Sequence, residues 1–470
     1  MKPKKIFILL PDGVGLRNFA FTSFVEIGEM LGWEIIFWNH TPFDLTTLGF
    51  HEIKLKNRPR PMTDLLKRAK IQAELIYFEK KFEDPVYQSY KFPASNSNLK
   101  AIIKNGIVSL FTFFYRGEKG LRRLQKRLKS SERGSDLYRH CKAVLEREKP
   151  DLVFCTNQRP VNAISPLLAA QDLNIPTATF IFSWDNLSKA TMIVEADHYF
   201  VWSELMLQEL LKYYPTIEKS QIIISGTPQF EAHCNDTLIL PREVFFKEQG
   251  LDLQRNYICF SGDDVTTSPD DPQYLEDVAA AVTQLNSKGS QLGIVFRRCP
   301  VDFSGRYNSV LEKFKGIITE IAPLWEKQGD QWNTILPLKE DIALQVNTIH
   351  HSFGVINLGS TMIFDAVAHN KPCFYINYDV LDKKDLNWSV RKIYNYVHFR
   401  SMPEDSPVYW LNNKNEISEK IEQILNCAQT TGAAKEWFKI INQDPPQDAS
   451  KRIWLGIDEL LKNKAKHILN

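Results

Sequence analysis

Closely spaced pairs of cysteines are missing from this sequence. Its seven cysteines are scattered, odd in number and never spaced as CxxC, which argues against a disulfide scaffold or a structural zinc site. Several stand inside apolar runs such as Leu152–Cys155, where buried free thiols are common. No HExxH or DxD-type pattern suggests a required metal. We therefore predict free cysteines in a reducing compartment and expect no metal cofactor.

Long hydrophobic runs are also missing. Nothing in the chain approaches the roughly 18 consecutive apolar residues that are needed to span a bilayer. The apolar run Ile6–Leu10 is too short for the core of a signal peptide, and it leads directly into Pro11, Asp12 and Gly13,. This run is typical of a first buried strand. We expect a cytoplasmic protein, peripheral at most to the inner membrane face.

A strong net charge and low-complexity segments are absent as well. The formal net charge of +2 gives no argument for nucleic-acid binding,, and no tract has the composition of a disordered arm. The chain has 470 residues, of which 43% are hydrophobic. This exceeds an ordinary single domain, so two domains with separate cores are expected.

Short apolar runs alternate with helix-period segments through the first half. Continuous apolar strands separated by helices predict a parallel sheet covered on both faces. The expected strands are Lys5–Leu10, Trp33–Trp38, Asp151–Cys155, Thr177–Phe182, Tyr199–Trp202 and Gln221–Ser225. The expected helices include Asp64–Phe82, Glu118–Glu148 and Ser203–Tyr213.

The alternation stops near Gly226 and resumes after Pro241, which suits the start of a helix,. The strands expected there are Tyr257–Ser261, Leu292–Arg297, Thr334–Leu336, Gly354–Asn357 and Cys373–Ile376. The expected helices are Pro272–Asn286, Asp341–His350, Thr361–Ala368, Glu416–Cys427 and Ala449–Lys462.

These patterns predict an α/β protein with two Rossmann-like, doubly wound domains that face a cleft. The first domain is expected over 1–235 and the second over 236–448. The C-terminal helix, over 449–470, is expected to pack back on the first domain. Because ligands of such sheets bind beyond the carboxyl ends of strands, we look for chemistry in the loops that follow strands.

One loop of the second domain, from Gly359 to Asp365, has the features of an anion site. Gly359 allows a sharp turn, and Ser360 suits the helix N-cap, where free amides and the helix dipole favour phosphate. Thr361 and Asp365 are four residues apart and share a helix face, so the carboxylate could accept the hydroxyls of a ribose. The alternative is an ordinary capped helix. We predict a nucleotide-diphosphate site.

Two segments carry a resemblance to a known superfamily. NLGSTMIFDAVAHNKPCFYI resembles the donor loop of GT-B glycosyltransferases, particularly those near the CDP-glycerol glycerophosphotransferases. FSWDNLSKATMIVEADHYFVWSELMLQEL, with IIISGTPQFE after it, is similar to bacterial surface-polysaccharide transferases of that superfamily. With the stretch from Ile258 to Asp263, the resemblance covers most of Asp151 to Ile376.

This chain departs from those relatives at two points. Glu231 stands where a G-x-x-x-F-D motif has Asp, which is a conservative change. Cys299 stands where relatives often have the His of R-x-H-P, which weakens a glycerophosphotransferase interpretation. Arg297 can still provide a fixed cation for phosphate.

Five further loop residues are candidates. Asp12 and Asp185 each follow a strand and are candidate general bases, between which the sequence does not choose. Arg17 is a candidate phosphate contact. The alternative for these three residues is a purely structural role in turns. The G-x-G after the first strand lacks the third glycine of a dinucleotide-binding motif, which argues against NAD binding. In the second domain, Ser261 and Gly262 could bring amides to the donor phosphates.

The segment from Lys100 to Arg133 has ten Lys or Arg residues but two Glu, and it contains the apolar run Ile107–Tyr115. Aromatic residues beside a basic helix suit an anionic membrane surface. The alternative is a core helix with a solvated basic neighbour.

The resemblance implies a glycosyltransferase that moves a sugar from a nucleotide sugar to a saccharide or lipid-linked acceptor in surface polysaccharide or glycoconjugate synthesis. UDP is the expected nucleotide, although the residues leave the base open, and no other cofactor is expected. Polyol-phosphate transfer of the CDP-glycerol type, 2-epimerisation of a nucleotide sugar and a non-catalytic scaffold remain alternatives.

Overall fold

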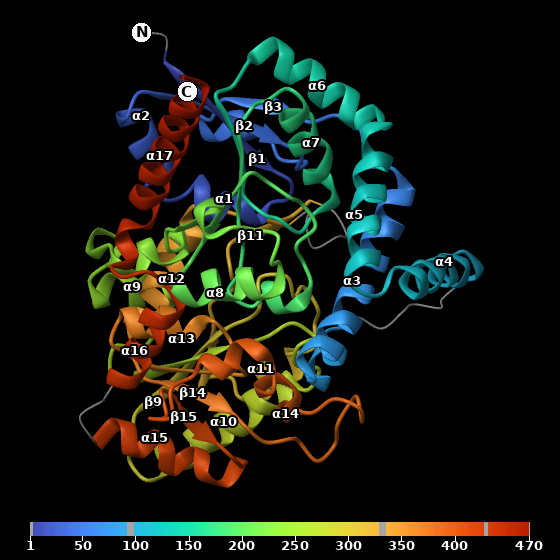
Figure 1. Ribbon diagram of the computed structural model, residues 1–470. Helices are drawn as coiled ribbons and strands as arrows, with labels where there is room; N and C mark the ends of the chain where they lie inside the picture. Colours follow the sequence, from blue (N-terminus) through green and yellow to red (C-terminus); the bar gives the residue numbers. More distant parts are fainter. Residues whose placement is uncertain (1–2, 92–97, 329–334, 427–430, 470) are drawn as a thin grey trace. The chain divides into compact units, whose positions relative to one another are not determined.

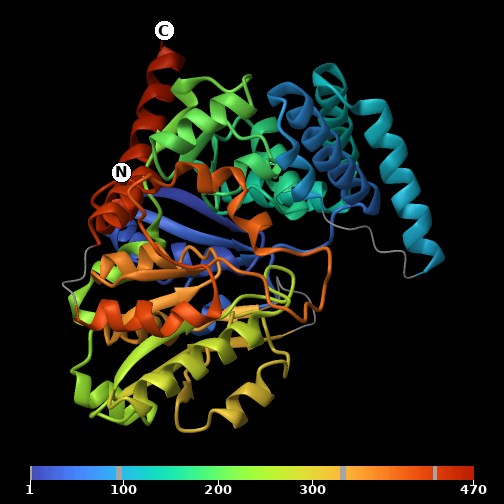
Figure 2. The ribbon, with the colours of Figure 1, turned by 90° about the horizontal axis from the view of Figure 1, so that it is seen from below.

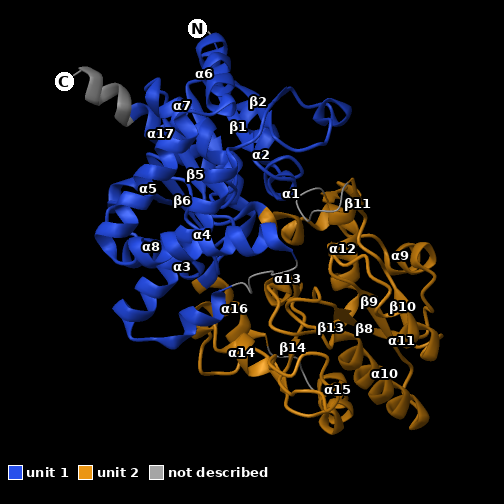
Figure 3. Cartoon of the chain, turned by 90° about the vertical axis from the view of Figure 1, so that its right-hand side faces the viewer, with its two compact units in different colours: residues 1–228, 441–470 blue, residues 229–440 orange. Residues whose placement is uncertain are grey.

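The chain divides into two compact units in the computed structural model, which describes residues 3–91, 98–328, 335–426 and 431–469. Unit 1 contains residues 1–228 and 441–470, and unit 2 contains residues 229–440 (Figure 3). The chain therefore leaves unit 1 a few residues before the boundary expected at 235. It returns to unit 1 before the boundary expected at 448.

Unit 1 is built on a seven-stranded parallel sheet with the strand order β3-β2-β1-β4-β5-β6-β7. Six of its strands follow the apolar runs expected from the sequence, while the short β3 carries no such run. The strands are β1 (Lys4–Leu10), β2 (Trp33–Asn39), β3 (Glu52–Lys54), β4 (Leu152–Cys155), β5 (Thr177–Phe180), β6 (His198–Val201) and β7 (Ile222–Ile224).

Helices cover both faces of this sheet. Alternate residues of a strand point to opposite faces, and Val153 and Cys155 of β4 belong to the core that packs against helices α3 to α7. Between them, Phe154 points to the other layer, where its ring lies 5.3 Å from that of Phe19 in α1. The helices before α8 are α1 (Val14–Phe19), α2 (Phe24–Met30), α3 (Pro61–Phe82), α4 (Leu99–Tyr115), α5 (Glu118–Arg133), α6 (Asp136–Glu148) and α7 (Ile164–Asp172).

The last helix of the chain, α17 (Ala449–Leu469), packs on unit 1 beside α2, as the sequence predicted (Figure 1). Trp454 is fully buried there and its ring stacks on that of Phe24 at 4.8 Å. Its indole Nε1–H donates to the Phe24 carbonyl at 2.7 Å. At Gly28 a Cβ atom would lie 2.2 Å from the Trp454 ring, so only glycine permits this approach.

The helix expected over Glu118–Glu148 was wrong in its length. The structure divides it into α5 and α6 at Gly134. Ser135 caps the second helix because its hydroxyl accepts the Tyr138 N–H at 3.0 Å,. α8 (Glu204–Tyr213) matches its expected position and is capped in the same way by Ser203.

Unit 2 has a six-stranded parallel sheet with the order β10-β9-β8-β13-β14-β15. The strand expected near Leu336 is instead part of a separate antiparallel pair, β11 with β12, while β10 and β15 were not expected. The strands are β8 (Asn256–Ser261), β9 (Leu292–Arg297), β10 (Ile318–Glu320), β11 (Trp325–Lys327), β12 (Ile335–Pro337), β13 (Ser352–Asn357), β14 (Cys373–Ile376) and β15 (Tyr409–Leu411).

Four helices of unit 2, α10, α12, α13 and α15, begin and end close to their expected positions, whereas no range was predicted for α9, α11, α14 and α16. Cys427, the expected end of one helix, lies outside the described residues. The helices are α9 (Arg242–Gln249), α10 (Asp271–Ser287), α11 (Asn308–Lys313), α12 (Glu340–His350), α13 (Met362–Ala368), α14 (Val390–Tyr394), α15 (Ile417–Asn426) and α16 (Gly432–Ile441).

The six cysteines of the described residues are all free, as expected, and four of them are buried. Within the same residues, no helix combines the length and the apolar character that crossing a membrane requires. No group of three or more His, Cys, Asp or Glu side chains in the described ranges is arranged to hold a metal ion.

Candidate functional site

The clearest candidate for proton transfer is Asp12, at the carboxyl end of β1. Asp12 is 2% exposed, and its carboxylate accepts the Val14 N–H at 3.3 Å. It also accepts the side-chain N–H of Asn157 at 2.9 Å. Asn157 follows β4, which pairs directly with β1. The neighbouring strands β1 and β4 are therefore followed by two side chains that are hydrogen-bonded to each other, at the edge where ligands of such sheets bind.

Burial raises the pKa of Asp12 to about 6, against the lowering effects of Arg159, of the hydrogen bonds from Val14 and Asn157, and of Lys67. Lys67 belongs to α3, and burial lowers the pKa of its ammonium group. A carboxyl group with a pKa near 6 is ionised at neutral pH, yet is a stronger base than an exposed aspartate. The cations beside it would also favour a bound anion.

Loop residues after β2 extend this polar edge. His40 follows β2, and its Nδ1 lies 3.0 Å from the side-chain nitrogen of Asn162. Asn162 also donates to the Pro11 carbonyl at 3.4 Å. Asn162, which follows β4 in the chain, thus links the loop after β1 to the loop after β2.

The other two candidates of unit 1 occupy different positions. Asp185, in the loop after β5, pairs with Lys189 and accepts the side-chain N–H of Asn186 at 2.9 Å. Arg17 is half-buried in the last turn of α1. The structure gives Asp12 and Asp185 separate partners, and the role of each as a base stays a prediction.

Sequence reasoning missed the groups that surround Asp12. Asn157 and Arg159 directly follow the strand expected over Asp151–Cys155, so the rule that selected Asp12 could also have selected them. Lys67 lies in the middle of a long helix, and no local pattern distinguishes it from the other lysines there. Its position near Asp12 becomes visible only in the structure.

In unit 2, the loop from Gly359 to Thr361 turns as expected, but the polar groups of Ser360 form hydrogen bonds within the unit. Gly359 has a φ of +66°, and an added Cβ would lie 2.9 Å from Ile393, so glycine is required for the turn and for packing against α14. The Ser360 hydroxyl accepts the Met362 N–H at 3.3 Å. Thr361 is half-buried and occupies the N-cap position of α13 without a side-chain cap bond.

Asp365 is directed into the interior of unit 2. It is 5% exposed, and its carboxylate accepts the Gln345 side-chain N–H at 3.1 Å. Its other oxygen lies 3.3 Å from His233 Nε2, and His233 Nδ1 lies 3.1 Å from His369 Nε2. This buried chain of polar side chains supplies partners for Asp365 within the unit, and ribose binding by Asp365 stays a prediction.

Arg297 and Gly262 are also engaged within unit 2. Arg297, at the end of β9, is 3% exposed and donates from one nitrogen to both carboxylate oxygens of Asp341 at 2.8 Å. Its Nη1 is buried without a hydrogen-bond partner among the described residues. The Gly262 N–H, expected to reach a phosphate, instead donates to the Arg297 carbonyl at 2.9 Å. Ser261 is the last residue of β8 and pairs with Arg297 in the sheet.

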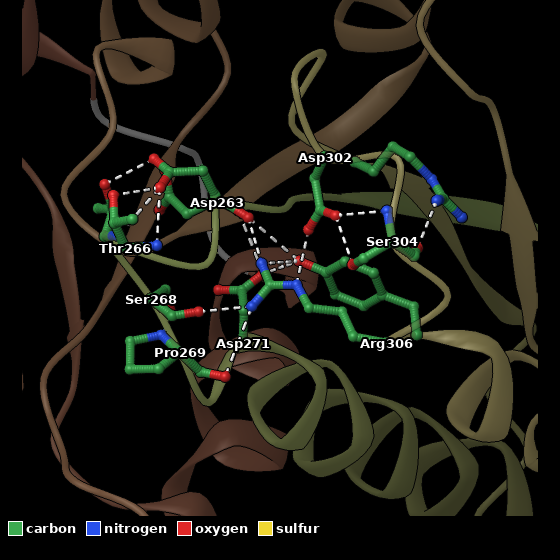
Figure 4. A network of polar contacts seen from close by, with 12 residues as sticks. Asp263, Thr266, Ser268, Pro269, Asp271, Asp302, Ser304 and Arg306 are labelled. Atoms are coloured by element: carbon green, nitrogen blue, oxygen red, sulfur yellow. Dashed lines mark hydrogen bonds and ion pairs between the residues drawn. The ribbon is translucent and has the colours of Figure 1, made fainter. Parts of the chain in front are cut away.

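An acidic network that the sequence analysis did not anticipate follows β8 (Figure 4). Burial raises the pKa of Asp263, and the neighbouring Asp271 raises it further; burial also raises the pKa of Asp271, to about 6. Arg306 bonds to the Asp263 carbonyl and to the carboxylate of Asp302, and Tyr307 donates to Asp271 at 2.7 Å. This network fixes the loop next to Ser261 and Gly262 and makes that end of the sheet acidic.

The sequence matches no protein-family model and no curated protein. Solved structures match the fold over nearly the whole chain. They include S. aureus MnaA in a co-structure with UDP (14% identity, 98% of this chain and 97% of that chain, TM-score 0.52). Also similar is a putative UDP-N-acetylglucosamine 2-epimerase from Listeria monocytogenes (11% identity, 98% of this chain and 97% of that chain, TM-score 0.55). A third similar structure is a glycosyltransferase from Rickettsia africae (11% identity, 98% of this chain and 99% of that chain, TM-score 0.52). These proteins share the GT-B fold, and this chain has that fold.

Proposed function

We propose that this chain is an enzyme that acts on a nucleotide-diphosphate sugar and transfers the sugar to an acceptor hydroxyl. The observation that carries the proposal is the buried carboxyl group of Asp12, whose raised pKa of about 6 suits a general base at neutral pH,. The GT-B fold supports it, since similar structures are named for UDP, for UDP-N-acetylglucosamine and for glycosyl transfer. UDP is accordingly the proposed nucleotide.

In this mechanism the carboxylate of Asp12 accepts the proton of the acceptor hydroxyl while that oxygen forms a bond to the anomeric carbon. The bond between the anomeric carbon and the phosphate oxygen breaks, and the nucleoside diphosphate leaves with the electron pair. Arg159 and Lys67 act electrostatically on Asp12 and keep its carboxylate form accessible. The base contributes about 10²–10⁴-fold to the rate.

We assign the donor to unit 2, at the loops that follow β9 and β13. Ser360 and Thr361 are half-buried, so their hydroxyls are accessible in part, and Arg297 retains one N–H group without a hydrogen-bond partner in the described chain. On unit 1, Arg17 stays a proposed phosphate contact. The chemistry requires no cofactor besides the sugar nucleotide.

A nucleotide-sugar 2-epimerase is the second candidate, favoured by the similarity of the fold to the Listeria protein at a TM-score of 0.55. An epimerase converts its nucleotide sugar alone, whereas a transferase releases the nucleotide only as an acceptor is glycosylated. The two functions therefore differ in whether the nucleotide sugar is converted without an acceptor.

The experiment follows the products of UDP-glucose and UDP-N-acetylglucosamine at pH 7.5, with and without an extract of saccharide and lipid-linked acceptors. Acceptor-dependent UDP release, reduced at least 100-fold by Asp12→Asn, is expected. The matched control is Asp136→Asn, since the Asp136 side chain is 74% exposed on α6. Conversion of UDP-N-acetylglucosamine without an acceptor would identify an epimerase, and full activity of Asp12→Asn would reject the assigned base.

A further inference from the structure

Helix α4 has two apolar faces, and one of them packs inside unit 1. Val108 is 1% exposed and Thr112 is 7% exposed. The Thr112 hydroxyl donates within α4 to the Val108 carbonyl at 2.8 Å. Ile107 and Phe111 pack on the same core, which also contains residues of α3 and α5. This face anchors the helix, so its position does not depend on a partner.

The opposite face of α4 is apolar and exposed. Successive residues of an α-helix are rotated by about 100°, so positions spaced by three and four share one side. On that side lie residues that are half or more exposed: Leu99 (71%), Ile102 (50%), Ile103 (55%), Leu110 (57%), Phe113 (58%) and Phe114 (66%). An exposed stripe of this extent marks an interaction surface. Figure 2 shows α4, in blue-green, at the margin of the helices of unit 1.

The charges around this stripe are mostly positive, with the exposed Glu118 paired to Arg122 at 2.6 Å. Lys100 and Lys104 are exposed on α4, and the helix contains no Asp or Glu. Arg116, directly after it, stacks over the Phe113 ring at 4.5 Å. The outward side of α5 adds exposed basic side chains, and of the two glutamates in 100–133, Glu132 is buried. The exposed basic residues on α5 include Lys119, Arg122, Arg123, Lys126 and Arg127.

We propose that α4 is the surface by which unit 1 docks on an anionic lipid bilayer. The apolar stripe would lie in the plane of the interface, below the head groups, while the long side chains of Lys100, Lys104 and Arg116 reach the lipid phosphates. The helix has 17 residues, a length of about 25 Å, and its inner face belongs to the core. It therefore lies along the bilayer surface and does not cross it.

The charge pattern favours a lipid surface over a second copy of the chain. Two copies joined through α4 would bring two basic clusters together, in which three of the ten basic residues, Arg122, Lys129 and Arg133, have an acidic partner within their own copy. The excess of positive charge opposes association. An anionic bilayer provides the opposite charge and an apolar layer at the same surface. This inference does not depend on the proposed enzymatic function.

The test measures binding of the full chain to vesicles of phosphatidylglycerol and phosphatidylcholine in equal parts, by flotation. We expect binding at 50 mM salt that weakens at 500 mM salt, and no binding to pure phosphatidylcholine. The double substitution Phe113→Ser with Phe114→Ser should weaken partitioning at least tenfold. Lys100→Gln with Lys104→Gln should weaken it about 25-fold, at about fivefold for each charge.

Matched controls lie on unit 2. Leu381 and Leu386 are 92% and 85% exposed, and Leu381→Ser with Leu386→Ser should leave vesicle binding unchanged. Lys247→Gln with Lys288→Gln serves as the charge control, because both lysines are exposed. Absence of flotation at low salt, or equal flotation of the phenylalanine variant, overturns the proposal. A dimer in sedimentation velocity that Phe113→Ser with Phe114→Ser dissociates would also overturn it, and would assign the surface to a second copy.

Discussion

Asp12 combines deep burial with two adjacent cations, and this combination explains its properties. Loss of hydration favours the neutral carboxyl group, while Arg159 and Lys67 favour the ionised form,. Burial has the larger effect, so the pKa of Asp12 rises to about 6. An ionised Asp12 therefore costs folding free energy at neutral pH. Such a cost is typical of groups kept for chemistry.

Asp12→Asn should accordingly gain stability over the wild type as the pH rises. The folded-state pKa of about 6 lies above the ordinary aspartate pKa of 3.8, so the folded protein holds this proton after the unfolded chain has lost it. The stability that the proton provides is lost between about pH 4 and pH 6. We expect the difference between variant and wild type to grow by about 2–3 kcal/mol from pH 4 to pH 7.5.

Thermal melting at these two pH values measures this difference. The variant exchanges one hydrogen-bond acceptor for a donor near Asn157, which adds an offset at every pH but leaves the trend intact. Asp136→Asn on the exposed side of α6 is the control, and its difference from wild type should stay within about 0.5 kcal/mol. If the stability difference between Asp12→Asn and the wild type does not change between pH 4 and pH 7.5, the raised pKa of Asp12 is contradicted.

Single residues show what sequence reasoning can select at this scale and what it cannot. Asp12 was selected because strand ends predict ligand sites, and its role stays a prediction. The direction of the Asp365 side chain was not predicted, since His233 and Gln345 come from distant parts of unit 2 and meet Asp365 only through tertiary packing. Similarly, the pairing of Arg297 with Asp341 joins two elements whose contact the sequence leaves open.

At the scale of elements, strongly apolar strands and capped helices were predictable, and short elements were not. β1, β4 and β9 follow continuous apolar runs, whereas β10 and β15 have three residues each and gain their strand conformation from pairing at the sheet edges. Such short segments carry too little periodicity to be recognised.

Helix α17 packs on unit 1 through a large buried side chain. Trp454 is fully buried between Phe24 and Trp33, with ring centroids at 4.8 and 5.4 Å. Trp454→Ala should therefore cost about 3–5 kcal/mol of the stability of unit 1. Leu455 is 60% exposed on the same helix, so Leu455→Ala should cost less than about 0.5 kcal/mol. Denaturant unfolding measures both, and equal effects would contradict the packing of α17 on α2.

At the scale of the whole molecule, unit 1 is formed by two separate stretches of the chain, 1–228 and 441–470, with unit 2 inserted between them. The two doubly wound domains were predictable because apolar strands and helices alternate twice along the sequence. The return of the chain to unit 1 at Ile441, the last residue of α16, required the structure, because the sequence patterns placed this boundary after residue 448.

The central claim is that this molecule binds a nucleotide-diphosphate sugar, and a thermal-shift panel with UDP, GDP and CDP tests it most directly. A ligand at 100 times its dissociation constant stabilises the folded state by about 2.7 kcal/mol, which corresponds to a shift of a few degrees in a chain of this size. We predict the largest shift with UDP, whereas a larger shift with CDP would favour a CDP-glycerol-type donor. No shift with any of the three nucleotides at millimolar concentration would contradict the account.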